Sequence, residues 1–211
     1  MSRLSEFKRT GKYNGIIRII ADPQFLFLCY KEIKSHPGNM TEGITSTTLD
    51  GINWKYFENL ASDMLKGKFR FSPARRILIP KTGKSGMRPL GIGSHREKIV
   101  QKAVSILLEC IFEPTFLDCS YGFRYNRSVS QPLKELYLKG KNYQWVIQGD
   151  ISKCFDEISH SLILDLLGKY ISCDRTLSLI AQHISAGYID PITKQLVKPS
   201  IGTPQGSILS P

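Results

Sequence analysis

The spacing of apolar residues predicts helices in the first third of the chain. Apolar positions recur every three to four residues after Asp22-Pro23 and again through "NWKYFENLASDMLKGK", residues 53–68. Asp22 and Asn53 are of the residue types that cap helix N-termini, and Pro23 suits a first turn. The apolar stripe expected to pack in the core comprises Trp54, Phe57, Leu60, Ala61, Met64 and Leu65.

The pattern changes in the middle of the chain. "RRILIPKTGKSGMRPLGI", residues 75–92, reads as two short strands joined by a turn of Gly, Lys and Ser, which predicts a basic hairpin. Ser94 is followed three residues later by Glu97, as in a capping box, and an apolar periodic run follows over residues 98–112. A long helix is therefore predicted after the hairpin.

The last third mixes both kinds of element. "YQWVIQGDI", residues 143–151, predicts a buried strand that ends at Asp150. Helices are expected from Ser159 and over residues 174–188, followed by a hairpin and the Gly-rich turn "GTPQGS", residues 202–207. Both helices and short strands are therefore expected in this part of the chain.

Composition narrows the function classes. The 211-residue chain is long enough for one large domain or two small ones. No apolar run approaches the roughly 18 residues that cross a bilayer, so no membrane partner is expected. The five cysteines form no CxxC pair, which favours reduced thiols inside a cell. The net charge of +11 favours polyanions such as nucleic acid, although a solvated basic surface gives the same balance.

Two patterns suggest chemistry. A carboxylate after a strand, as at Asp150, can hold Mg²⁺, and phosphoryl transfer by two metals about 4 Å apart needs two or three such carboxylates. The basic hairpin and the "GTPQGS" turn offer cations, backbone N–H groups and the Gln205 amide to a triphosphate. Taken singly, Asp150 could simply cap a turn, and the Gly-rich segment could be only a turn.

Five segments in order resemble the reverse transcriptases encoded by group II introns, also called intron maturases, over about residues 39–211. "GNMTEGITSTTLDG" is similar to their N-terminal extension motif, and "FRFSPARRILIPKTGKSGMRPLGIGSHREKIVQKAV" to their first fingers block. "SYGFRYNRS", "VIQGDISKCFDEISH" and "GTPQGSILSP" are similar to the second block, the palm block with the first catalytic aspartate, and the fourth block.

The resemblance implies a catalytic role for Asp150, which would bind Mg²⁺ with help from the carbonyl of Ile151. Phe155 would stack under the sugar of an incoming dNTP and exclude a 2′-OH, unless it is an ordinary core aromatic. Asp156 is expected to position the turn. The other residues expected to bind the nucleotide are Lys81, Arg88, Gln205 and Gly206. Those expected to follow an intron RNA template, paired to a DNA primer, are Arg75, Arg76, Phe123 and Arg124, for which a surface salt bridge or a packing role is the alternative.

The resemblance also implies an α+β right-hand polymerase fold of fingers and palm, truncated before the second catalytic hairpin. The expected parts are an N-terminal helical extension over residues 1–38, fingers over 39–140 and a partial palm over 141–211. The four histidines, His36, His95, His160 and His183, are expected at the surface or at helix caps.

One part of the family pattern is absent. The family's fifth block carries two adjacent aspartates, and this sequence contains no Asp-Asp pair. We therefore expect no polymerisation by the chain alone. Three explanations for the missing block are that a second polypeptide completes the enzyme, that the reading frame is truncated, or that the chain is retained for RNA binding. The alternative functions are a non-catalytic RNA-binding splicing factor and a decayed fragment. Family analogy favours the mitochondrion, with the chloroplast and the bacterial cytoplasm as alternatives.

Overall fold

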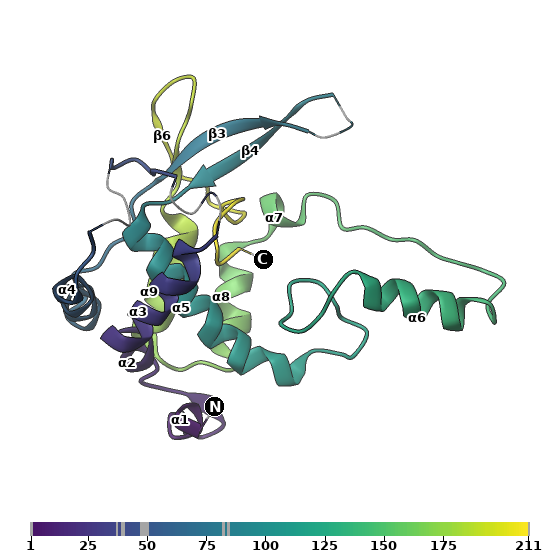
Figure 1. The fold of residues 1–211 in the computed structure, drawn as a ribbon, viewed down its shortest axis with the longest axis horizontal. Coiled ribbons are helices and arrows are strands. Elements are labelled where there is room, and N and C mark those ends of the chain that lie inside the picture. Colours follow the sequence, from purple (N-terminus) through teal and green to yellow (C-terminus); the bar gives the residue numbers. More distant parts are fainter. Residues whose placement is uncertain are drawn as a thin grey trace.

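The computed structural model describes residues 2–36, 38, 41–46, 51–81, 83 and 85–210 (Figure 1). The predicted N-terminal extension motif, "GNMTEGITSTTLDG", lies partly outside these residues. The helices are α1 (Ser2–Ser5), α2 (Ile17–Ile20), α3 (Pro23–Lys34), α4 (Trp54–Leu65), α5 (His95–Phe112), η1 (Glu113–Thr115), α6 (Ser130–Gly140), α7 (Cys154–Glu157), α8 (His160–Gly168) and α9 (Asp174–Ser185). The strands are β1 (Lys8–Arg9), β2 (Lys12–Tyr13), β3 (Ala74–Pro80), β4 (Met87–Ile92), β5 (Tyr188–Ile189) and β6 (Leu196–Val197).

The larger sheet has the strand order β4-β3-β5-β6. β3 and β4 form the predicted antiparallel hairpin, with Arg75 opposite Ile92 and Pro80 opposite Met87. β5 runs parallel to β3, and β6 returns antiparallel to β5, so the second predicted hairpin is also confirmed. The β3–β4 hairpin projects above the helices (Figure 1). The sheet thus joins the middle of the chain to its last quarter.

The core lies where α2, α3, α4, α5 and α9 pack together (Figure 1). α5 buries its apolar face against α3 and α2, with Ile99, Val100 and Ala103 fully enclosed. Apolar residues at spacings of three and four form one stripe on a helix, so burying that stripe fixes the rotation of α5. Polar groups at its N-terminal end then face the sheet.

The predicted helix caps are confirmed. The Asp22 carboxylate accepts hydrogen bonds from the amides of Gln24 and Phe25, and the Asn53 side chain caps α4. Ser94 and Glu97 form the capping box of α5, and Ser159 caps α8. Each cap satisfies amide groups that have no partner within their own helix.

The predicted core stripe of α4 is correct at its centre and wrong at both ends. Phe57, Leu60, Ala61 and Met64 are buried, whereas Trp54 and Leu65 are 46% and 39% exposed. These two residues occupy the first and last positions of the helix, where fewer neighbouring side chains are available to cover them. Trp54 instead places its ring edge against Phe27 of α3.

The predicted buried strand over residues 143–151 is wrong. This segment is irregular and exposed, with Trp145 at 87% and Ile147 at 98% of full exposure. A strand is stable only when neighbouring strands pair with its amide and carbonyl groups. Among the described residues no strand pairs with residues 143–151, so this segment has the apolar sequence of a strand but not the backbone hydrogen bonds that would form one.

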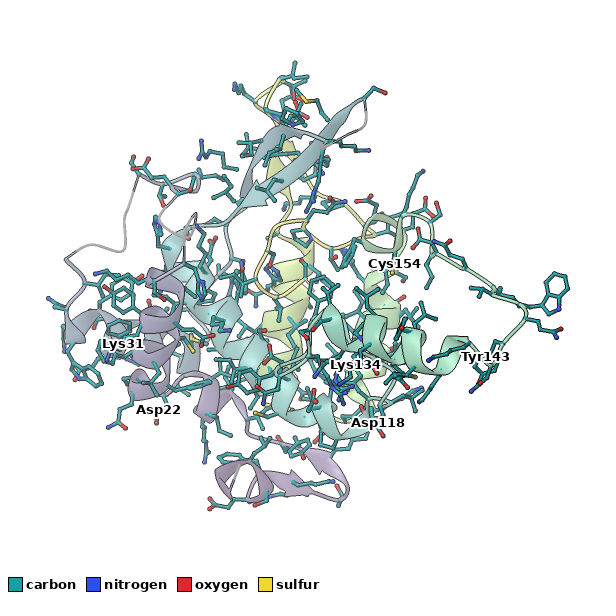
Figure 2. The ribbon with its side chains drawn as sticks, turned by 45° about the vertical axis from the view of Figure 1, so that its right-hand side comes forward. Asp22, Lys31, Asp118, Lys134, Tyr143 and Cys154 are labelled. Atoms are coloured by element: carbon teal, nitrogen blue, oxygen red, sulfur yellow. The ribbon has the colours of Figure 1, made fainter. Side chains whose placement is uncertain are left out.

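The same region forms an arm that leaves the body of the molecule (Figure 1). The arm consists of α6 and the irregular segments before and after it, and α6 itself has no buried residue. Figure 2 labels Tyr143 toward the outer end of the arm and Cys154 where the chain rejoins the body. Exposed apolar side chains on the arm include Leu133, Leu136 and Tyr137.

The N-terminal residues pack against the last third of the chain. The amide of Tyr13 donates to the carbonyl of Tyr170, and the carbonyl of Tyr13 accepts from the amide of Ser172, at 2.7 and 2.9 Å. The domain boundaries at residues 38 and 140 remain predictions. Over the described ranges, no helix is both long and apolar enough to cross a membrane.

We expect Leu60→Ala to lower the free energy of unfolding by about 2–5 kcal/mol, because it leaves a cavity at a 2% exposed position. Leu65→Ala on the same helix is the matched control and should cost under about 1 kcal/mol. Urea unfolding followed by circular dichroism measures both. Equal losses for the two variants would contradict the placement of the core.

Candidate active site

Asp150 lies on the irregular segment that leads into α7. Lys153, which adopts a left-handed conformation with φ of 49°, turns the chain into this short helix, and its carbonyl accepts hydrogen bonds from the amides of Asp156 and Glu157. Asp150 therefore follows an exposed, unpaired segment rather than a buried strand. Its carboxylate is accessible to a ligand.

An open groove of about 770 Å³ runs along this segment. It brings together four of the residues predicted to bind metal or nucleotide, which are Asp150, Ile151, Phe155 and Gln205. The other residues that line it are Gly149, Lys153, Cys154 and Asp156. Lys153 and Cys154 lie within the palm motif but were not predicted as site residues, because a residue's place in a motif does not show which way its side chain points.

The Gly-rich turn Gly202–Ser207 is clamped to the segment that carries Phe155. The amide of Gly202 donates to the carbonyl of Ile158, and the amide of Thr203 donates to the carbonyl of Phe155, both at 2.7 Å. The Gln205 amide nitrogen donates to the Asp156 carboxylate at 2.8 Å. Asp156 thus holds the Gln205 side chain at the groove, in agreement with the positioning role predicted for it.

The turn is also joined to the fingers hairpin. The carbonyl of Gln205 accepts a hydrogen bond of 2.7 Å from the amide of Gly91 in β4. A Cβ atom at Gly206 would lie 2.3 Å from Leu90 of the same strand. The turn therefore contacts both the predicted palm and the predicted fingers, and its glycines permit the close approach.

On the side facing the helices, the turn rests on buried polar groups. The Ser207 hydroxyl donates to Gln101 Oε1 of α5 at 3.1 Å and lies 2.9 Å from Nε2 of His183 of α9. Burial lowers the pKa of His183 to about 4, so the imidazole is neutral at pH 7.

The surface prediction for the histidines is wrong at His183 and at His95, both of which are buried. It failed at His183 because this residue occupies a core position on the apolar face of α9, among Leu179, Ile180 and Ile184. A polar residue at an apolar position of a helix was the signal that could have found it. Gln101 on α5 gives the same signal.

Lys81 and Arg88 lie on the β3–β4 hairpin, and both side chains are exposed. They do not line the groove, but the hairpin projects above α7 in both views (Figures 1 and 2). Arg88 is opposite Ile79 in the ladder, and Lys81 follows the last residue of β3. The hairpin keeps both cations outside the core.

The residues predicted to contact RNA divide into two groups. Arg75 donates to the carbonyl of Glu42, and the Arg76 guanidinium stacks 3.5 Å from the centre of the Tyr188 ring, on the sheet. Arg76, Tyr188, Asp156 and Gln205 also line a smaller cavity of about 150 Å³ next to the turn. Arg75 and Arg76 thus lie at the base of the β3–β4 hairpin, near the start of β3.

Phe123 and Arg124 lie on the arm. Phe123 is exposed with φ of 56°, a conformation that only glycine and a few other residues adopt readily. The Arg124 guanidinium donates to the Glu113 carboxylate and to the carbonyls of Leu117 and Ser120, and its hydrogen bonds hold the pKa of Glu113 below its usual range. These contacts match the packing alternative that the sequence left open for Arg124.

The donor set for a metal has suitable chemistry but too few ligands. Asp150 and the carbonyl of Ile151 offer the oxygen ligands that Mg²⁺ prefers. In the part of the chain that the structure describes, no group of three or more His, Cys, Asp or Glu side chains could hold a metal ion. These residues alone do not complete a two-metal centre.

The fold and the site together define an α+β protein of the right-hand polymerase class, with a fingers hairpin and part of a palm. The family profile described as reverse transcriptase (RNA-dependent DNA polymerase) matches residues 79–211, more than half of the chain. The chain therefore belongs to the reverse transcriptase family, which confirms the resemblance seen in its motifs.

Relatives with known names support the intron-encoded branch. The COX1/OXI3 intron 1 protein of Saccharomyces cerevisiae is 42% identical over 198 residues, which cover 94% of this chain and 24% of that protein. The group II intron-encoded protein LtrA of Lactococcus lactis is 35% identical over 199 residues, covering 94% of this chain and 33% of that protein. The chain thus spans about a quarter to a third of the length of these relatives.

The fold has a counterpart among solved structures. A chain of a Cas6-RT-Cas1–Cas2 complex superimposes with a TM-score of 0.57 over 93% of this chain and 32% of that one, at 22% sequence identity. This similarity confirms the predicted fold class.

We expect Gly202→Ala to destabilise the protein more than Gly67→Ala. Both glycines have positive φ, which costs an alanine about 1–2 kcal/mol, but a Cβ at Gly67 meets no atom within 4 Å. At Gly202 it would lie 2.6 Å from the carbonyl oxygen of Asp156, so the clamp must open. Urea unfolding should show at least about 1 kcal/mol of additional loss for Gly202→Ala. Equal losses would contradict the close approach.

Proposed function

We propose that this chain supplies the fingers and the first part of the palm of a group II intron reverse transcriptase, an RNA-directed DNA polymerase that also serves intron splicing and mobility. The observation that carries this proposal is the double attachment of the Gly202–Ser207 turn. Hydrogen bonds of 2.7 Å tie it to the Phe155–Ile158 segment on one side and to β4 on the other. Three sequence blocks far apart in the chain thus meet at this turn, and two of them line the groove.

The residues at the groove suit an incoming deoxynucleotide. The Phe155 ring is exposed and lines the groove, where it offers an apolar surface for the sugar. The proposed role of this ring is to exclude a 2′-OH. Gln205, whose side chain is held by Asp156, also lines the groove. Gly206 does not line it, but its missing Cβ lets the turn approach Leu90 of β4, and we propose that it supports the nucleotide pocket from there. Lys81 and Arg88 on the projecting hairpin reach the triphosphate, for which Lys supplies a point charge and Arg a fork of donors.

Asp150 and Ile151 are the proposed metal-binding positions. Mg²⁺ bound by a complete set of carboxylates would neutralise phosphate charge during nucleotidyl transfer. One carboxylate and one carbonyl fall short of that set among the described residues, so the proposal needs further carboxylates, which a second polypeptide could supply. The proposed role of this chain's own residues is to bind and orient the nucleotide.

Intron RNA is the proposed template, paired to a DNA primer. Arg75 and Arg76 place positive charge on β3, and Arg76 lines the small cavity that shares Asp156 and Gln205 with the groove. The chain carries a net charge of +11. Phosphate contacts of this kind position a nucleic acid without reading its sequence. Because the described Arg124 contacts are internal, we assign the RNA-contacting role to Arg75, Arg76 and the exposed ring of Phe123.

A second candidate function is an RNA-binding splicing factor without polymerase activity. It is favoured by the incomplete ligand set around Asp150, since RNA binding requires the basic fingers surface but no metal centre. Two relatives that match over 89 residues carry names that place them in mitochondria, a protein of Marchantia polymorpha and an intron maturase of Arabidopsis thaliana. We propose the mitochondrion as the location for either function.

Primer extension on an RNA template with Mg²⁺ and dNTPs tests the polymerase proposal. We expect no incorporation by the 211-residue chain alone, because a single carboxylate cannot hold two metals. RNA binding should be present and should weaken about tenfold or more between about 50 and 200 mM salt, since each phosphate contact releases counterions. Arg75→Ala with Arg76→Ala should reduce the affinity and the salt slope.

The outcomes of this experiment separate the functions. Incorporation that is lost in Asp150→Ala would contradict the requirement for further carboxylates. RNA binding that does not change with salt, or no RNA binding, would contradict both proposed functions. Lys139→Ala, at an exposed residue of α6, is the control for loss of positive charge alone.

We expect Phe155→Val to reduce the preference for deoxynucleotides. The wild-type chain should bind dTTP more tightly than UTP in the presence of Mg²⁺, because the larger ring meets a 2′-OH. The variant should narrow this difference about tenfold, measured by equilibrium dialysis with labelled nucleotides. If Phe155→Val discriminates between dTTP and UTP as well as wild type does, Phe155 is not part of the nucleotide site. If Asp150→Ala binds dTTP as tightly as wild type does, that binding takes place away from the groove.

A further inference from the structure

The helix-facing side of the Gly202–Ser207 turn ends in a compact hydrogen-bond network. Its centre is the Ser207 hydroxyl, which contacts Gln101 of α5 and His183 of α9. Gln101 and His183 are each 4% exposed, and the Phe71 ring packs 4.9 Å from the imidazole. The network therefore joins the turn to the core helices α5 and α9.

Counting protons fixes the direction of these bonds. The hydroxyl of Ser207 carries one proton, which it donates to Gln101 Oε1, an atom that can only accept. The bond to His183 must then run from Nε2–H to the Ser207 oxygen. The same oxygen accepts from the amide of Leu209 at 3.2 Å, so the hydroxyl is fully used.

Gln101 holds the chain at a second point. Its Oε1 also accepts from the amide of Ile208 at 3.2 Å. Gln101 and His183 thereby hold Ser207 and Ile208 directly, and the Ser207 hydroxyl in turn holds the amide of Leu209. Gln205, which lines the groove, and Gly206, which packs against β4, immediately precede Ser207, so a shift of this anchor moves both residues.

We propose that His183 and Gln101 are positioning residues for the nucleotide-binding turn, acting through Ser207 to set the place of Gln205 and Gly206. This inference rests on the proposed function of the turn. Neither side chain lines the groove, so neither touches the nucleotide. Their effect falls on the affinity for the deoxynucleotide and not on the affinity for RNA, because the proposed RNA contacts, Arg75, Arg76 and Phe123, make no hydrogen bond to this network.

The experiment compares Ser207→Ala, His183→Leu and His183→Gln with wild type. The glutamine side chain can place an N–H donor where Nε2 lies, whereas leucine cannot. Ser185→Ala on α9 is the matched control, because it removes a hydroxyl whose hydrogen bonds stay within its own helix. Two quantities are measured, namely amide hydrogen exchange at Ile208 and Leu209, and the dissociation constant for dTTP with Mg²⁺.

We expect Ser207→Ala and His183→Leu to speed exchange at these two amides about tenfold and to weaken dTTP binding about tenfold, with RNA binding unchanged. His183→Gln and Ser185→Ala should stay within about threefold of wild type. The proposal is overturned if Ser207→Ala leaves both quantities unchanged, or if His183→Gln is as damaging as His183→Leu.

Two further outcomes are distinguishable. Wild-type protein that binds no dTTP contradicts the proposed function, while the exchange rates still decide whether the network fixes the turn. If His183→Leu does not fold, Ser207→Ala and His183→Gln decide the question, because both leave a polar or small side chain at the site.

Discussion

The site depends on one constraint, the need for the Gly202–Ser207 turn to satisfy contacts on three sides at once. Its backbone is bonded to the Phe155–Ile158 segment, to Gly91 of β4 and, through Ser207, to α5 and α9. Backbone groups that pair at 2.7 Å leave no space for a Cβ atom between them, so Gly202 is required by geometry. The groove exists because these three attachments hold its walls together.

The helical core supplies the rigid base for this arrangement. α5 starts beside the sheet with a capping box and buries its apolar stripe against α2 and α3, which fixes where Gln101 points. α9 does the same for His183. Buried polar side chains in such positions are costly unless they are paired, so their pairing with Ser207 links the stability of the core to the shape of the turn.

The arm, in contrast to the core, has exposed apolar side chains. Residues 143–151 carry the apolar pattern of a sheet strand, yet Ile147 is almost fully exposed and no described strand pairs with the segment. Asp150 is the candidate metal ligand at the end of this segment. The chain spans only a quarter to a third of its named relatives, and its described residues provide neither the pairing strands nor the further carboxylates. Fold and chemistry are incomplete at the same place.

The sequence by itself determined the local elements and the family. Caps at Asp22, Asn53 and Ser94, the two hairpins and the ordered motifs follow from interactions between residues close in the chain, which local patterns record. Tertiary structure alone decided the rest: that residues 143–151 lie exposed, that Arg124 pairs internally, and that His183 reaches Ser207. The partner of His183 is 24 residues away, and the partners of Arg124 lie within 11 residues of it. Sequence patterns show what an apolar or polar residue can bind, but they do not show which residues folding places beside it.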